Sequence, residues 1–223
     1  MIRIDLLEEF PDVEYLDDHW IRHNKREATR NLEAVPRQFA DAEVDDELVE
    51  RWVRAIAGQA VIDGLAGNPR VQSGPSLLMR GATGTGKTHH VYAAVRSLWL
   101  SGVDARFIVI TAADLLAELR PTGTGQAALK RFAAIPLLCL DDLGAHAVTE
   151  WSTDMLFRLI NARYEARRPI VVTTNLPMVT RERGVPTLVD RLGDRIASRL
   201  VEMARNWQVA LKGEDRRRAG QPA

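Results

Sequence analysis

The sequence predicts an α/β fold built on a parallel sheet, and two patterns carry that prediction. From Ser76 onward, short apolar runs alternate with longer segments that have the composition of helices. Two of the short runs, PLLCL and PIVVTT, lack the alternation of a strand that faces water on one side. Strands of this kind are covered on both faces, as in parallel sheets with crossover helices.

We expect five strands, at residues 77–80, 106–110, 137–141, 170–174 and 208–211. The helices predicted between and after them are residues 87–100, 112–119, 126–134, 153–166 and 187–204. Upstream, apolar residues at spacings of three and four predict another amphipathic helix, with Asp45 as its cap. Its apolar positions are Leu48, Val49, Trp52, Val53 and Ile56.

Composition divides the chain into three parts. Residues 1–34 are charged and lack an apolar stripe long enough for a domain, so we expect an N-terminal arm in which Trp20 and Ile21 indicate a short helix. Residues 35–212 suffice for one domain with a substantial core. Residues 213–223 are expected to form a basic C-terminal tail.

Overall composition excludes several classes of protein. Hydrophobic residues make up 46% and charged residues 27%, within the globular range, and no stretch approaches the ~20 apolar residues of a membrane span. The acidic N-terminus does not have the pattern of a secretory leader, so we expect a cytoplasmic protein without membrane contact. The 30 basic and 30 acidic side chains cancel, so any nucleic-acid affinity must come from local clusters.

A phosphate-binding loop is the strongest signal in the chain. It follows a predicted strand, opens a predicted helix and matches G-x-x-x-x-G-K-[ST]. Its residues are Gly81, Ala82, Thr83, Gly84, Thr85, Gly86, Lys87 and Thr88. The glycines allow backbone amides to face the phosphates, Lys87 neutralises the outer phosphates, and Thr88 places its hydroxyl on Mg²⁺. The loop therefore predicts a P-loop nucleotide-binding fold that takes ATP and Mg²⁺.

Two histidines and the cysteine are interpreted as packing residues that have no chemical role. His89 and His90 follow the loop, but neighbouring helix positions point about 100° apart and no other metal ligand stands at suitable spacing. Cys139, the one cysteine, lies in an apolar run where a thiol acts as a small hydrophobe.

Polar residues end two of the predicted strands. Asp141 and Asp142 follow PLLCL, so we expect Asp141 to hold Mg²⁺ and Asp142 to orient and deprotonate the attacking water. Asn175 follows the next strand, and because parallel strands gather ligands at their carboxyl ends, its amide is expected to hold that water near the γ-phosphate.

Together, GATGTGKTHH, LLCLDDLGAH, INARYEARRPIVVTTNLP, RIASRL and GEDRRR resemble the DnaC/DnaI-type bacterial helicase loaders and the related IstB-type transposition ATPases. The resemblance runs from about Val35 to Arg218. It implies an AAA+ core, with a five-stranded parallel sheet flanked by helices and an ATP site completed by a neighbouring copy of the chain, so that the protein forms a homo-oligomer.

The resemblance also implies roles for basic residues. Arg199 matches best the arginine finger that reaches into a neighbour's site, with Arg195 as the alternative, and Arg217 matches a further position near the nucleotide. Loaders bind single-stranded DNA through helices after the second strand. The corresponding residues of this chain are Thr111, Arg120, Lys130 and Arg131.

The leading functional hypothesis is an ATPase that loads a replicative helicase on single-stranded DNA. Its alternatives are an IstB-type ATPase that binds duplex DNA and activates a transposase, and a nucleotide-gated adaptor with little turnover. A small-molecule kinase is less favoured because no acceptor-binding lid is found. The N-terminal arm is expected to dock a partner through the apolar residues Leu6, Leu7, Phe10 and Tyr15.

Overall fold

A parallel sheet forms the centre of the computed structural model, which describes residues 2–13, 15–33, 35–121, 123–180, 184–213 and 215. The strands are β1 (Leu77–Arg80), β2 (Phe107–Thr111), β3 (Leu137–Asp141), β4 (Ile170–Thr174) and β5 (Gln208–Ala210). Their order is β2-β3-β4-β1-β5, and every neighbouring pair is parallel. The five-stranded parallel α/β sheet that the sequence predicted is therefore confirmed, with shifts of one residue at the ends of two strands.

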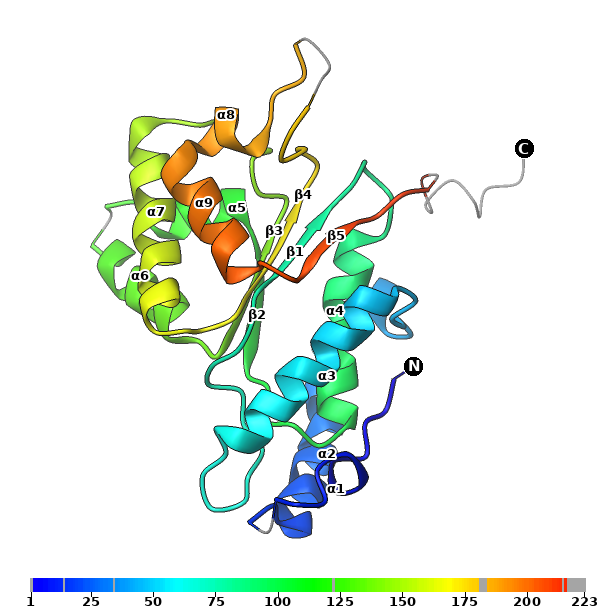
Figure 1. Cartoon of the computed structure of the whole chain (residues 1–223). Coiled ribbons are helices and arrows are strands. Elements are labelled where there is room, and N and C mark those ends of the chain that lie inside the picture. Colours follow the sequence, from blue (N-terminus) through cyan, green and yellow to red (C-terminus); the bar gives the residue numbers. More distant parts are fainter. Residues whose placement is uncertain are drawn as a thin grey trace.

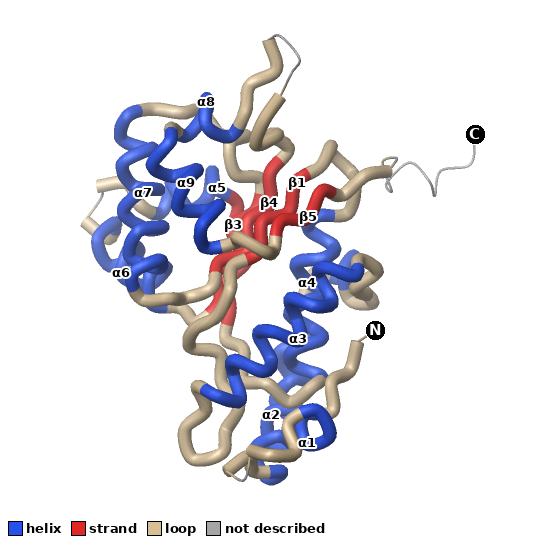
Figure 2. The backbone as a smooth tube through the Cα atoms, in the orientation of Figure 1, coloured by secondary structure: helices blue, strands red, loops and turns tan. Residues whose placement is uncertain are grey.

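Helices cover both faces of the sheet (Figures 1 and 2). On one face lie α1 (Leu6–Glu9), α2 (Asp18–Leu32), α3 (Glu47–Ile62) and α4 (Lys87–Leu100). On the other lie α5 (Ala112–Glu118), α6 (Gly125–Ala134), α7 (Glu150–Glu165), α8 (Leu188–Leu192) and α9 (Asp194–Met203). A short 3₁₀ turn, η1 (Arg37–Phe39), precedes α3. Each layer has its own apolar core against the sheet.

The N-terminal segment packs into the first layer. The side chains of Ile4, Leu6, Ile21 and Ala28 are buried in the core that contains α3 and α4, whereas Leu7 and Tyr15 are exposed. The helix indicated by Trp20 is 15 residues long and not short. Its apolar stripe is hard to read because the inward face includes the buried Asn24, which donates to Asn68 Oδ1 and Gly102 O, both at 2.8 Å.

Three predicted helices differ from the structure at a boundary or in their continuity. The cap of α3 is Asp46, not Asp45, because the Asp46 carboxylate accepts from the backbone amides of Leu48 and Val49. The helix predicted at residues 187–204 is two helices, α8 and α9, because Gly193 (φ +79°) interrupts the helical backbone between them. Thr149 caps α7 and starts it three residues earlier than predicted.

Candidate nucleotide-binding site

The phosphate loop joins β1 to α4 at the carboxyl end of the sheet. Gly84 (φ +82°) and Gly86 (φ +93°) have left-handed backbone conformations that L side chains rarely adopt. The segment that follows β5 lies against the loop, because a Cβ at Gly81 would stand 2.5 Å from Leu211 O, and a Cβ at Gly84 would overlap the Asp215 carboxylate. The glycines therefore serve both the turn and the close approach of this segment.

We expect Gly84→Ala to weaken ATP binding and to destabilise the fold, because it adds about 1–2 kcal/mol of left-handed strain and a clash with Asp215. Gly184→Ala is a matched control, since Gly184 has φ +83° and nothing stands within 4 Å of an added Cβ. Urea unfolding and titration with a fluorescent ATP analogue measure both variants. Equal effects at the two glycines would show that only backbone strain matters.

Lys87 lies at the centre of the site and is buried. Its Nζ donates to Gly81 O and Ala82 O, both at 2.9 Å, and to Asn175 Oδ1 at 2.6 Å. All three acceptors are neutral, so phosphate oxygens, which form stronger charge-assisted bonds, compete well for the ammonium group. The lysine is thus held where the loop, α4 and the end of β4 meet.

Thr88 and Asp141 form a pair suited to a hard cation. Thr88 Oγ1 donates to Asp141 Oδ2 at 2.9 Å, and the other carboxylate oxygen accepts from the buried Thr173 hydroxyl. Carboxylate, hydroxyl and phosphate oxygens are the ligands that Mg²⁺ prefers, usually with several waters retained. The donor set at this position therefore suits Mg²⁺ beside a bound phosphate.

Asp142 and Asn175 stand at the ends of neighbouring strands. Asp142 has φ +53°, and its backbone amide donates to Thr173 Oγ1 at 3.0 Å. A left-handed aspartate is strained, and strained residues cluster at functional sites. Because Lys87 Nζ can only donate, the Asn175 oxygen must face it, which leaves the amide nitrogen as the donor toward the cavity.

These residues share one cavity of about 720 Å³. It is lined by Gln38, Phe39, Thr83, Gly84, Gly86, Lys87, Thr88, His89, Asp142 and Asn175. Gln38, Phe39 and His89 were not predicted from the sequence to be part of it. The Phe39 ring stacks on Tyr92 of α4 at 4.7 Å, and His89 Nε2 lies 3.0 Å from Glu43 O, so α4 holds the segment before α3 against the loop.

His90 and Cys139, which the sequence indicated as structural residues, are both buried. His90 is fully buried, with Nε2 2.9 Å from Asp45 Oδ1, which agrees with a packing role. Burial raises the pKa of the Cys139 thiol, so this cysteine stays protonated within β3. Among the described residues, no three His, Cys, Asp or Glu side chains form a group able to hold a metal ion, and no helix is long and apolar enough to cross a membrane.

Arg199, Arg195 and the DNA candidates lie outside the cavity lining. The Arg199 guanidinium lies 4.5 Å from the centre of the Tyr164 ring, on the face formed by α7 and α9, and Arg195 is exposed one turn earlier. Arg217 lies outside the described residues. The role of each arginine stays a prediction.

The DNA candidates Thr111, Arg120, Lys130 and Arg131 lie on or beside α5 and α6. Thr111 caps α5 through Asp114 N, and Arg131 pairs with Glu118 at 2.5 Å, while Arg120 and Lys130 are exposed. Their contact with DNA stays a prediction.

The sheet order, the phosphate loop and the acidic end of β3 together define a P-loop protein of the AAA+ class. A model of the IstB-like ATP binding protein family matches residues 15–220, and the chain belongs to that family. The match confirms the resemblance inferred from the motifs. It begins at residue 15 and thus includes α2, which those motifs did not reach.

Individual relatives agree with this assignment. An insertion sequence ATP-binding protein of Sinorhizobium fredii is 31% identical over 157 residues, which cover 69% of this chain and 51% of that protein. The chain thus spans about half the length of this curated relative.

Solved structures show the same fold. The DnaC helicase loader is 26% identical with a TM-score of 0.56, covering 79% of this chain and 100% of that chain. AMPPCP-bound DnaA from Aquifex aeolicus has 20% identity and a TM-score of 0.53, covering 77% of this chain and 47% of that one. At that identity the similarity to DnaA concerns the fold alone.

Proposed function

We propose that the protein is a Mg²⁺-dependent ATPase that converts ATP and water to ADP and phosphate. The observation that carries the proposal is the meeting of Lys87, the Thr88–Asp141 pair, Asp142 and Asn175 at the carboxyl ends of β1, β3 and β4. Each supplies a different part of phosphoryl transfer, and the two strand-end residues Asp142 and Asn175 favour an ATPase over an adaptor that only binds nucleotide.

The proposed mechanism uses groups that the fold holds in place. Backbone amides of the loop and the start of α4 bind the phosphates, and Lys87 neutralises their charge. Bound Mg²⁺ supplies further charge neutralisation between the phosphates, with Thr88 and Asp141 to hold it. Asp142 accepts the proton of the attacking water, and Asn175 Nδ2 donates to that water or to the γ-phosphate.

The base end of the nucleotide has a separate set of contacts. Phe39 and Gln38 lie on the same cavity wall as His89, and an aromatic ring beside an amide is suited to a purine, through packing and hydrogen bonding. Since α4 carries both Lys87 and the Phe39 contact with Tyr92, phosphate binding and base binding share one rigid helix.

We propose a homo-oligomer that forms on ATP or DNA, with Arg199 of a neighbouring copy approaching the γ-phosphate. The stack on Tyr164 limits the freedom of Arg199, and the Tyr164 hydroxyl donates to Glu202 Oε1 at 2.8 Å, which fixes the ring. An ordered arginine loses less entropy on entering a second site. Single-stranded DNA is the proposed DNA partner, as in the loader hypothesis.

Two classes of protein partner have specific support. The similarity to the DnaC helicase loader, whose solved chain is covered in full, supports a replicative helicase as the partner. The family match and the insertion sequence relative, of which the chain covers about half, support a transposase. Pull-down of the purified protein with the host's replicative helicase and with a transposase from the same genome separates the two, because the loader hypothesis requires the helicase to be retained.

We expect Asp142→Asn to bind ATP with nearly unchanged affinity but to release phosphate about 10²–10⁴-fold more slowly, because the amide cannot accept a proton from water. Steady-state phosphate release and titration with a fluorescent ATP analogue measure the two quantities. Wild-type protein that binds ATP tightly without releasing phosphate, at any protein or DNA concentration, would establish the nucleotide-gated adaptor instead.

A further inference from the structure

Two adjoining hollows lie at the amino ends of the strands, at the opposite end of the sheet from the nucleotide site. The larger, about 500 Å³, lies between α2 and the start of β2, and the other, about 420 Å³, lies beside the starts of β2 and β3. Both are lined by Arg70 and Arg106, so they form one continuous depression. None of its lining residues belongs to the nucleotide cavity.

The lining of the depression contains three arginines and three acidic side chains, Glu27, Asp63 and Asp104. Two of the acids have basic partners, since Asp104 pairs with Arg70 at 2.8 Å and Glu27 pairs with Arg30 at 2.9 Å. The third, Asp63, accepts bonds from the neutral Ser73 and Gln59.

Two further arginines line the depression. Arg106 is exposed at the start of β2, and Arg168 donates to Ala133 O, a neutral acceptor that leaves its charge in place. When Arg30, the partner of Glu27, is counted with Arg70, Arg106 and Arg168, the basic side chains here outnumber the acidic ones by one.

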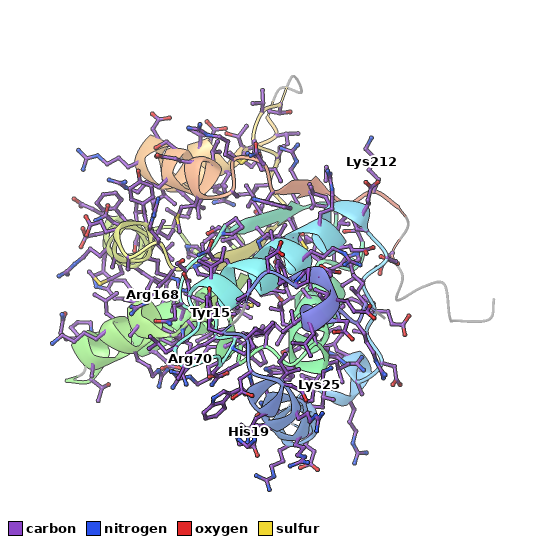
Figure 3. All side chains as sticks on the ribbon, turned by 60° about the horizontal axis from the view of Figure 1, so that its bottom comes forward. Tyr15, His19, Lys25, Arg70, Arg168 and Lys212 are labelled. Atoms are coloured by element: carbon purple, nitrogen blue, oxygen red, sulfur yellow. The ribbon has the colours of Figure 1, made fainter. Side chains whose placement is uncertain are left out.

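Helix α2 extends this charge beside the larger hollow. Its solvent face carries Lys25 and Arg26, both exposed, together with Arg22 and Arg30, which have acidic partners on the same helix. Figure 3 shows His19 and Lys25 on the same face of the molecule as Arg70 and Arg168. Lys25 and Arg26 therefore add positive charge to the helix that lines the larger hollow.

The larger hollow also offers surfaces for flat rings. Trp20 is half-buried in its wall, so part of the indole is exposed, and the rings of His19 and His23 form T-shaped contacts with it at 5.7 and 5.5 Å. The amides of Asn24, Asn31 and Asn68 line the same hollow and supply hydrogen-bonding groups. Aromatic platforms beside basic side chains bind single strands, because every unpaired base has a face that can stack.

We infer that this depression, named here the amino-end groove (Trp20, His23, Arg70, Arg106 and Arg168), binds a single strand of nucleic acid. The phosphates contact Arg106 and Arg168, and an unpaired base stacks on Trp20. This inference rests on the DNA-binding part of the proposed function but places the strand away from Thr111–Arg131, where the family resemblance had placed it. A duplex keeps its bases stacked on each other and cannot use Trp20 in this way.

The test is fluorescence anisotropy of a labelled thymidine oligonucleotide with full-length protein over a range of salt concentrations. We expect Arg106→Gln/Arg168→Gln to weaken binding and to lower the salt slope by about 1.4, or about 0.7 for each lost phosphate contact on a single strand. Trp20→Ala is expected to weaken binding about 5- to 100-fold at every salt concentration, and Trp20→Phe by less. Thermal unfolding checks that each variant folds.

Two matched variants identify the surface. Arg51→Gln/Arg158→Gln removes the same charge from α3 and α7, and we expect it to leave the salt slope unchanged. Arg120→Gln/Lys130→Gln tests the region after β2. The inference is overturned if only this last pair weakens binding, if wild-type protein binds no single strand, or if Trp20→Ala has no effect. Titration with a fluorescent ATP analogue is expected to give wild-type affinity for Arg106→Gln/Arg168→Gln, so a failure here is separate from a failure of the ATPase proposal.

Discussion

Lys87→Ala is expected to reduce phosphate release to background and to weaken ATP binding about 10- to 100-fold. Hydrogen bonds to charged groups contribute roughly 1.5–3 kcal/mol each, and among the described residues that line the cavity only Lys87 carries a permanent positive charge. The effect on turnover is larger than the effect on binding, because charge moves onto the phosphate oxygens during transfer. Phosphate release and titration with a fluorescent ATP analogue measure the two losses.

Two controls make this result specific. Lys87→Arg keeps the charge, but the larger planar guanidinium cannot donate to Gly81 O, Ala82 O and Asn175 Oδ1 as the ammonium does, so we expect it to recover little turnover. Arg158→Ala removes an exposed positive charge on α7 and is expected to have no effect on turnover. Phosphate release by Lys87→Ala near the wild-type rate would contradict the assignment of the site and point to a contaminating ATPase.

The cavity-lining residues that the sequence predicted all lie in short motifs that directly follow a strand. The phosphate loop, the acids after β3 and Asn175 after β4 each follow a strand that is apolar throughout, and the parallel sheet then brings the strand ends together. The contact of Lys87 with Asn175 joins residues 88 positions apart, yet it follows from strand order alone.

The part that sequence could not predict depends on long-range packing. Gln38 and Phe39 lie in a 3₁₀ turn without periodicity, and contacts with α4, among them the stack of Phe39 on Tyr92 and the contact of His89 with Glu43 O, bring them to the cavity. The packing of α2 was missed for a related reason. Its inward face includes Asn24, and a buried asparagine whose partners are Asn68 and Gly102 looks like a surface residue in the sequence.

Arg163, which the sequence pattern did not single out, is fully buried. Its guanidinium donates to Phe132 O and Ile135 O at 2.8 Å, to Pro136 O at 3.1 Å and to Pro169 O at 2.5 Å. Burial lowers its pKa to about 9, with Arg168 adding to the effect. The guanidinium therefore stays charged at neutral pH. Its hydrogen bonds join the end of α6 to the residues that precede β3 and β4.

We expect Arg163→Met to lower the free energy of unfolding by about 3–5 kcal/mol, because it leaves several buried carbonyl oxygens without a donor. Urea unfolding followed by circular dichroism measures the loss. Arg158→Met, an exposed position on the same helix, is expected to stay within about 0.5 kcal/mol of wild type. A loss below about 1 kcal/mol in Arg163→Met would mean that water or other groups replace the guanidinium.

The same variant links the fold to the site. The strands that Arg163 holds at their amino ends carry Asp141 and Asn175 at or just after their carboxyl ends. If the network sets the spacing of β3 and β4, Arg163→Met is expected to slow phosphate release at temperatures where the protein is still folded. The neighbouring contact of Thr173 with Asp141 lies within this strand pair, so a shift between the strands changes the magnesium position directly.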